Sequence, residues 1–268
     1  MELYLRGATL TVGEKKIITR LSFTVEKTIV GKVANKCKVA AYNLSANTKA
    51  YIEKYSGLMR LEAGYQDKLS ILFLGDIKKV EHKRESADIL TTIESGDGEK
   101  KITSAHVELS LAPGASVSQV VNAAVKAMGL AAGVIKGVPN TKYSNGFAYS
   151  GNVRDLLNLM AAKSDLDWSV QNNTLQIFPK DQDTGETAVL LNERTGLIGV
   201  PNKTEEGFKA KSLLNPEIMP GRMVKIEAKS LTGQSQFKVD TVKHTGDTQE
   251  GEWYTELEGG GKGKKKKK

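Results

Sequence analysis

Three short sequence blocks occur twice in this chain, in the same order, near its two ends. Ordered repetition of this kind indicates two related structural units, although amphipathic hairpins can also match by chance. The repeat therefore favours two β-barrel-like domains of one design. The matching blocks are Gly57–Glu62 with Gly221–Glu227, Phe73–His82 with Phe237–His244, and Leu90–Glu94 with Tyr254–Glu258.

Alternation of apolar and polar residues predicts β-strands throughout both ends of the chain. One helix interrupts the first group, because Ser45 can cap Ala46–Tyr55 and Gly57 can end it. The strands predicted before residue 110 are Leu3–Leu5, Ile17–Val25, Lys36–Ala41, Leu58–Glu62, Lys68–Glu81 and Ile89–Glu94. Those predicted after residue 186 are Thr187–Leu191, Gly207–Leu213, Arg222–Ala228, Gln236–His244 and Trp253–Glu258.

The segment between the two repeats has helical periodicity. Ser116 and Gln119 form a capping-box pair ahead of an apolar stripe at helical spacing, and Gly129 can stop that helix. A second helix is predicted after Asn152, followed by a hairpin from Trp168 to Phe178 with an Asn-rich turn. We therefore expect a mainly β protein with an α+β insertion. The expected divisions are a first β-barrel domain with one helix at 1–103, a helix-plus-hairpin domain at 104–180, a second β-barrel domain at 181–258 and a Gly/Lys tail at 259–268.

The net charge of +8 is concentrated at the C-terminus. Six of the 39 basic residues lie in the last seven positions, which leaves 33 basic residues against 31 acidic ones before them. The basic tail is therefore the candidate contact for a polyanion or an acidic partner, or else a solvated terminus. Its lysines are Lys262, Lys264, Lys265, Lys266, Lys267 and Lys268.

No catalytic, cofactor-binding or metal-binding residue can be assigned from the sequence. The three histidines lie near predicted strands without the spacing of a metal or catalytic motif, and His82 and His244 match in the repeat as polar positions at a domain edge. Cys37 alternates with apolar residues, which favours a buried strand position over a reactive thiol. An enzyme therefore has no support in the sequence.

Two segments resemble ligand loops only superficially. Asp181–Glu186 begins like a calcium loop, but its glycine is displaced and Asn192 stands where a bidentate Glu is needed, so a linker turn is expected. Gly96-Asp-Gly98 is not expected to open a helix after a strand, as a phosphate-binding loop must. These glycines are expected to form a turn.

The chain resembles the baseplate hub proteins of contractile-tailed phages, which are related to late control D-type and secretion-spike proteins. The resemblance extends to about Glu258 and depends on the order and spacing of many short segments. In the first half these are Val39–Tyr51, Leu61–Tyr65, Phe73–Asp76 and Ile93–Glu99. In the second half they are Ala188–Asn192, Thr195–Gly199, Leu213–Glu217, Pro220–Arg222, Lys243–Thr248 and Trp253–Glu256.

This resemblance implies a structural virion protein with two tail-tube-like β-barrels. It implies a homotrimer that adapts a hexameric tail tube protein to a trimeric spike protein around a central channel, with the tape-measure protein and passing phage DNA as further contacts. The sequence has no apolar run near the roughly 20 residues of a membrane span and no secretory leader. We therefore expect synthesis in the bacterial cytoplasm, location in the tail baseplate and no membrane insertion of its own.

Three alternatives stay open on the sequence alone. The lysine tail would suit a nucleic-acid-binding protein, although no base-stacking motif accompanies it. The hub of a prophage-derived injection particle would share the same architecture. A cell-wall hydrolase has only the context of phage tails in its favour.

Overall fold

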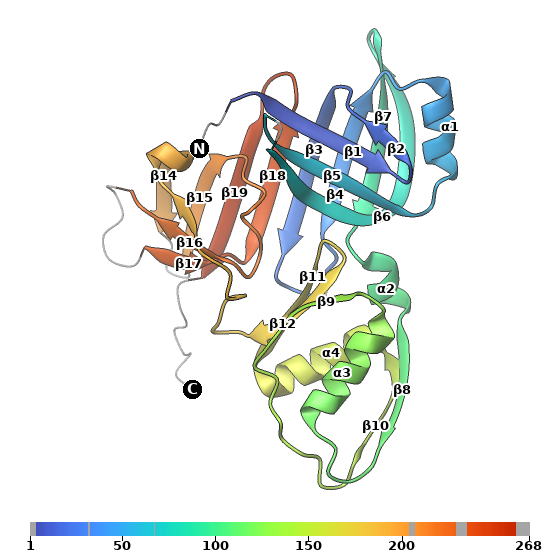
Figure 1. Cartoon of the computed structure of the whole chain (residues 1–268), viewed down its shortest axis with the longest axis vertical. Helices are drawn as coiled ribbons and strands as arrows, with labels where there is room; N and C mark the ends of the chain where they lie inside the picture. The colour runs from blue at the N-terminus through green and yellow to red at the C-terminus, as the bar shows by residue number, and fades with distance from the viewer. Residues whose placement is uncertain (1–3, 32, 67, 204–206, 229–234, 261–268) are drawn as a thin grey trace.

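The computed structural model describes residues 4–260 except 32, 67, 204–206 and 229–234, and it has three groups of elements (Figure 1). The N-terminal β region contains β1 (Arg6–Val12), β2 (Lys15–Ile17), β3 (Leu21–Thr28), β4 (Lys36–Tyr42), α1 (Ala46–Lys54), β5 (Leu58–Tyr65), β6 (Lys68–Glu85) and β7 (Asp88–Gly96). The middle region contains α2 (Glu99–Ser104), β8 (His106–Leu111), α3 (Val117–Met128), β9 (Ala131–Ile135), β10 (Phe147–Asn152), α4 (Val153–Ser164), β11 (Leu166–Gln171) and β12 (Thr174–Pro179).

The C-terminal β region completes the described chain. It contains β13 (Val189–Leu191), the 3-10 turn η1 (Glu193–Thr195), β14 (Leu197–Lys203), β15 (Gly207–Leu213), β16 (Met223–Ile226), β17 (Gln236–Lys238), β18 (Thr241–Asp247) and β19 (Trp253–Gly260). The protein is thus mainly β with few helices, as predicted. It has one large antiparallel sheet, two small mixed sheets and a two-stranded sheet.

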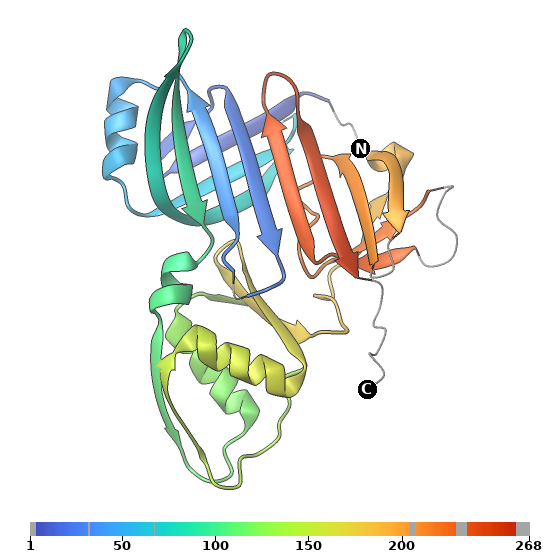
Figure 2. The same cartoon turned by 180° about the vertical axis from the view of Figure 1, so that it is seen from behind.

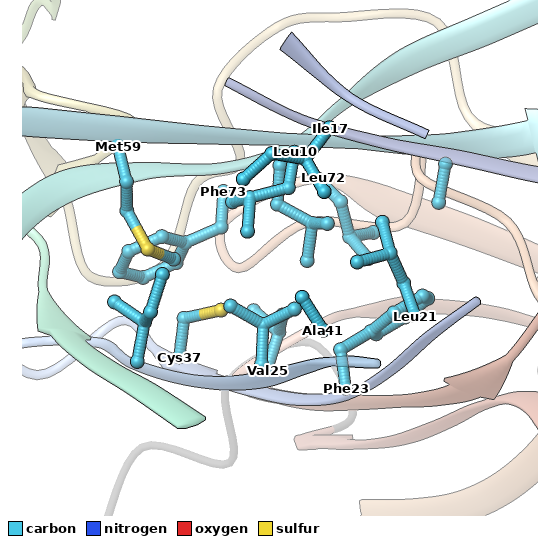
Figure 3. Packing of buried hydrophobic residues seen from close by; sticks show 14 of the residues in the cluster. Leu10, Ile17, Leu21, Phe23, Val25, Cys37, Ala41, Met59, Leu72 and Phe73 are labelled. Atoms are coloured by element: carbon cyan, nitrogen blue, oxygen red, sulfur yellow. The ribbon is translucent and has the colours of Figure 1, made fainter. Parts of the chain in front are cut away.

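In the N-terminal β region the core lies between two layers of strands, β3 and β4 on one side and β1, β5 and β6 on the other (Figure 3). Strand β6 is 18 residues long and joins the layers, because its first half pairs with β5 and its second half with β7. Register shifts at Leu61/Glu62 and Ile77/Lys79 accompany the bend. Leu10, Met59 and Phe73 fill the space between the layers with no exposed surface.

Several predicted boundaries in this region are wrong. Leu3 lies outside the described residues and Leu5 is not in a strand, since β1 begins at Arg6. The single strand expected over Ile17–Val25 is divided into β2 and β3. Ser45 caps α1 as predicted, but the helix ends at Lys54 with Tyr55 as its C-cap, so Gly57 does not end it.

The middle region packs α3 and α4 against its two small sheets, β8–β10 and β11–β12–β9 (Figure 1). The predicted capping box of Ser116 with Gln119 is present, and Gly129 ends α3 with a positive φ. Asn152 caps α4, and Trp168 is 4% exposed in the core, both as expected. The helix α2 and the strands β8, β9 and β10 were not predicted.

A buried polar cluster holds the middle region against the N-terminal β region. Asn172 and Asn173 form the β11–β12 turn with positive φ, and both donate their backbone N–H to the Asp97 carboxylate at 2.6 Å. Lys27 Nζ donates to Asn172 Oδ1 at 2.8 Å, and the Asn35 side chain donates to a main-chain oxygen of β11 at 2.7 Å. Because Lys27, Asn35 and Asp97 are buried, their hydrogen bonds to the β11–β12 hairpin favour one relative orientation of the two regions.

Candidate assembly surface

The N-terminal and C-terminal β regions share one sheet. Strand β18 pairs antiparallel with β3 over seven residues, from Thr241 opposite Thr28 to Asp247 opposite Ser22. The result is an eleven-stranded sheet with the order β14-β15-β19-β18-β3-β4-β7-β6-β5-β1-β2. Figure 2 shows β4, β3, β18 and β19 side by side across the junction. Segments more than 200 residues apart in the sequence are therefore joined by main-chain hydrogen bonds.

The strand order within this sheet repeats. The N-terminal region runs β3-β4-β7-β6, and the C-terminal region runs β14-β15-β19-β18. The first half of β6 pairs with β5. In the same way, β17, which directly precedes β18 in the chain, pairs with β16. The order of the three repeated sequence blocks thus matches the order of equivalent strands, which supports the predicted internal repeat.

Two matching side-chain contacts show which residues of the N-terminal and C-terminal β regions are equivalent. His82 Nδ1 lies 2.9 Å from Thr91 Oγ1, and His244 Nδ1 lies 2.9 Å from Thr255 Oγ1. Both histidines stand directly opposite their threonines in the register of the strands. The ion pairs Lys38–Glu94 at 3.4 Å and Lys209–Glu258 at 2.8 Å are also equivalent.

The outward face of the shared sheet carries alternating charges. Across five neighbouring strands, cross-strand partners run Lys211, Glu256, Lys243, Glu26 and Lys36. Opposite charges on adjacent strands attract, and here they continue across the β3–β18 junction. The surface therefore offers neither a basic stripe nor an acidic one. A shallow groove of about 360 Å³ lies on it, bordered by Glu26, Lys36, Lys243 and Glu256.

Comparison with known proteins identifies the family of this architecture. The family model described as Baseplate hub gp41 matches residues 7–232. The chain belongs to this family. It is accordingly a structural protein of the phage tail baseplate hub and not an enzyme, as expected from the sequence. No curated protein matches the sequence.

Solved structures similar to this hub protein are tail and secretion proteins. The 43 kDa tail protein of prophage MuSo2 from Shewanella oneidensis has a TM-score of 0.67 at 8% identity, with 95% of this chain and 98% of that chain covered. The E. coli c3393 protein, a type VI secretion component similar to T4 tail proteins gp27 and gp5, has a TM-score of 0.62 at 11% identity, with 93% and 75% covered. A chain of the Francisella PdpA-VgrG complex has a TM-score of 0.53 at 7% identity, with 94% of this chain and 57% of that chain covered. At these identities the likeness shows a shared tail-protein fold.

The candidate contact residues of the lysine tail, Lys262 and Lys264 to Lys268, lie outside the described residues of the hub protein. Strand β19 continues through Gly260, so the first two residues of the predicted tail belong to the sheet. Gly259 and Gly260 pair with Phe208 and Gly207.

The histidines His82, His106 and His244 lie on β6, β8 and β18, in agreement with the expectation that each occurs near a strand, although β8 itself was not predicted. The prediction that His244 sits at a domain edge is wrong, because β3 covers that edge and His244 is fully buried. Burial, together with the nearby Lys27 charge, lowers the pKa of His244 to about 3. Within the described residues no three His, Cys, Asp or Glu side chains gather as metal ligands.

The remaining sequence candidates have structural roles. Cys37 is buried on β4, where burial raises the pKa of its thiol well above the ordinary value. Asp183 accepts the N–H of Gly185 in the expected linker turn. The prediction for Gly96–Gly98 is wrong, since α2 begins directly after Gly98. Asp97 between these glycines accepts hydrogen bonds from the β11–β12 turn, so the segment serves packing between regions.

The main structural feature of this surface, the β3–β18 pairing, was not predicted from the sequence. Strand β3 alternates throughout, but its inward Lys27 is buried at 3% exposure. Lys27 donates to Asn172 of the β11–β12 turn, so a charged residue at this core position of β3 indicates the contact with the middle region and not the pairing with β18. No helix among the described residues is long and apolar enough to cross a membrane.

Proposed function

We propose that this hub protein forms a homotrimer that joins a hexameric tail tube to a trimeric spike in a contractile-tail baseplate. The supporting observation is that two equivalent strand sets, β3-β4-β7-β6 and β14-β15-β19-β18, lie side by side in one sheet. Three such chains contain six equivalent sets. A ring of them would offer nearly sixfold contacts to a tube and true threefold contacts to a spike.

In this proposal the two strand sets belong to two tail-tube-like β-barrel domains, 1–103 and 181–258, with the α+β domain 104–180 between them. Three separate apolar clusters support the division, and Phe73, Trp168 and Phe237 are buried members of one cluster each. The protein would be made in the bacterial cytoplasm and become part of the virion tail.

The outward face of the sheet is the proposed lining of a central channel. Its charges alternate in sign across strands, so the lysines have carboxylate neighbours and offer little net attraction to phosphate. Such a lining would let DNA and the tape-measure protein pass without being held. The similarity to a chain of a VgrG complex supports a spike-type protein as the neighbour at one end of the ring.

The proposal is tested by measuring the mass of the purified full chain, alone and together with tube and spike proteins. We expect a trimer, and a ternary assembly with an open centre in electron micrographs. Monomers under every condition would contradict the proposal.

Removing residues 262–268 distinguishes the hub from the DNA-binding alternative. A hub without these lysines should still trimerise and bind the spike. If the deletion left assembly intact but abolished the biological activity together with salt-sensitive DNA binding, the chain would instead act through its tail. A hub of a prophage-derived injection particle would behave like the phage hub in this test.

A further inference from the structure

The contact between Lys27 and Asn172 brings an amine and a primary amide together where the β11–β12 hairpin meets the end of β3 (Figure 1). Lys27 is 3% exposed, and its Nζ donates to Oδ1 of Asn172 at 2.8 Å. Because a carbonyl bond is about 1.23 Å long, an ordinary hydrogen-bond angle sets Nζ roughly 3.5 Å from the amide carbon Cγ. Atoms held about 3 to 3.5 Å apart are close to the geometry in which they react.

We propose that Lys27 and Asn172 are the site of an intramolecular isopeptide bond between Nζ and Cγ. The bond would join β3 of the shared sheet covalently to the β11–β12 turn, and so the N-terminal β region to the middle region. It would link positions that lie 145 residues apart in the sequence. Such a modification goes beyond the assembly role of the hub, because the chain itself supplies both reacting groups.

The reaction requires no oxidant, no reductant and no further reactant. The lone pair of the uncharged Nζ attacks Cγ, so that the Nζ–Cγ bond forms and the carbonyl electrons move onto Oδ1. When the carbonyl forms again, the Cγ–Nδ2 bond breaks. Nδ2 receives the proton that Nζ loses and leaves as ammonia. One amide replaces another, and the chain becomes lighter by about 17 Da, the mass of ammonia.

The surroundings of Lys27 favour the uncharged amine that the attack requires. Burial lowers the pKa of Lys27 to about 8, so roughly one molecule in ten has an uncharged amine at pH 7. Burial also raises the pKa of the nearby Cys37 thiol and lowers that of His244 to about 3, so both are uncharged at neutral pH. Asp97 is the carboxylate whose charge acts on Lys27.

Asp97 is the group suited to carry the proton from Nζ to Nδ2. It is fully buried, and burial raises the pKa of its carboxyl group. It also holds the turn beside Lys27, because it accepts the backbone N–H groups of Asn172 and Asn173. With the backbone held, rotation about the Cβ–Cγ bond of Asn172 turns the face of the amide toward Nζ. Asn172 is half-buried, which leaves ammonia a route to solvent.

Peptide mapping of the natural full chain tests the bond. After incubation at about pH 8.5 and digestion with trypsin, the bond would block cleavage at Lys27 and keep segment 21–32 attached to segment 164–180. The linked peptide should weigh about 17 Da less than the sum of its two parts. A succinimide at Asn172 would give the same loss of mass without a linked peptide. Absence of the linked peptide after prolonged incubation would overturn the proposal.

Three variants test which residues react. Lys27→Met removes the amine and Asn172→Gly removes the amide, so each should lower the yield of linked peptide at least about a hundredfold. Asn173→Gly is the matched control, since it removes the neighbouring amide and tolerates the positive φ of that position. It should form the linked peptide as the natural chain does. An undiminished 21–32 to 164–180 product in Lys27→Met or Asn172→Gly would overturn the assignment.

The rate of bond formation tests the proton step. In the natural chain it should rise from pH 6 to about pH 8 and then level off, because the uncharged amine of Lys27 becomes the main form. Asp97→Asn keeps an acceptor oxygen for the turn but cannot carry the proton, so it should slow the reaction at least about tenfold. Hydrogen exchange at Asn172 and Asn173 is measured in parallel to show that the turn is kept. A rate independent of pH, or an undiminished rate in Asp97→Asn, would overturn this step.

Discussion

The imidazole Nδ1 of His244 lies 2.9 Å from Oγ1 of Thr255, between two strands buried in the middle of the shared sheet. The same contact, at the same distance, joins His82 to Thr91 on the N-terminal side. One site is covered by β3, and the other faces the open edge of β6. The N-terminal and C-terminal β regions therefore contain the same His–Thr contact in two environments. The environments differ because β3 pairs with the strand of His244, whereas among the described residues the edge of the strand of His82 is open.

We expect the stability of the protein to fall as the pH is lowered below about 6.5, in part because of His244. Its pKa is about 3 in the folded protein and about 6.5 when unfolded, so between these values the unfolded chain binds more protons. This stabilising contribution is complete above about pH 6.5 and is lost as the pH falls through 3. When the free energy of unfolding is measured with urea from pH 7 to pH 4, it should change less with pH for His244→Gln than for the natural chain. Equal changes with pH would contradict this assignment.

Replacing Asp97 should loosen the contact between the middle and N-terminal regions. Asp97 is fully buried, and Asp97→Ala leaves the partly buried N–H groups of Asn172 and Asn173 without their acceptor, at a cost of about 2 to 4 kcal/mol in the free energy of unfolding. Hydrogen exchange at the β11–β12 turn should accelerate as well. Asp155→Ala, at an exposed carboxylate, is the matched control and should change stability by less than about 0.5 kcal/mol.

Trp253 connects the two β regions through apolar contacts. It is 1% exposed, its ring lies 5.5 Å from that of Phe23, and it packs in the core of the N-terminal region although it belongs to β19. Trp253→Ala should lower the free energy of unfolding by about 3 to 5 kcal/mol. The neighbouring Tyr254→Ala on the outward face should cost much less. Equal losses for the two variants in thermal or urea unfolding would contradict this role.

The equivalent ion pairs Lys38–Glu94 and Lys209–Glu258 should contribute little to stability. Both lie on the solvent-exposed face, where cross-strand pairs have coupling energies of about 0.2 to 1 kcal/mol. Double-mutant cycles with alanine should give values in this range for both pairs. Values of several kcal/mol would mean that the face is covered within the isolated chain.

Sequence patterns predicted those elements whose local chemistry determines them. The helix α3 has an apolar stripe, a capping box and a terminal glycine, and its predicted start after Ser116 and stop at Gly129 are confirmed. The β11–β12 hairpin has Asn172 and Asn173, which tolerate positive φ, in its turn. The position of such elements can be predicted from the local sequence, without knowledge of their tertiary contacts.

Elements that depend on distant partners were not predicted. Helix α2 has only six residues and begins after a glycine with positive φ, so it lacks a capping side chain. Strand β14 contains Gly199 and Pro201, both unfavourable in strands, and it is held by pairing with β15. The β3–β18 junction could not be deduced, because alternation in a strand indicates a buried face but not which strand covers its edge.

The symmetry of the assembled hub tests the central claim most directly. Electron cryomicroscopy of the hub bound to tube and spike proteins, viewed along the tube axis, should show three copies whose six β regions surround an open channel, with the outward face of the shared sheet toward the axis. Six copies in one ring, or a closed centre, would contradict the account.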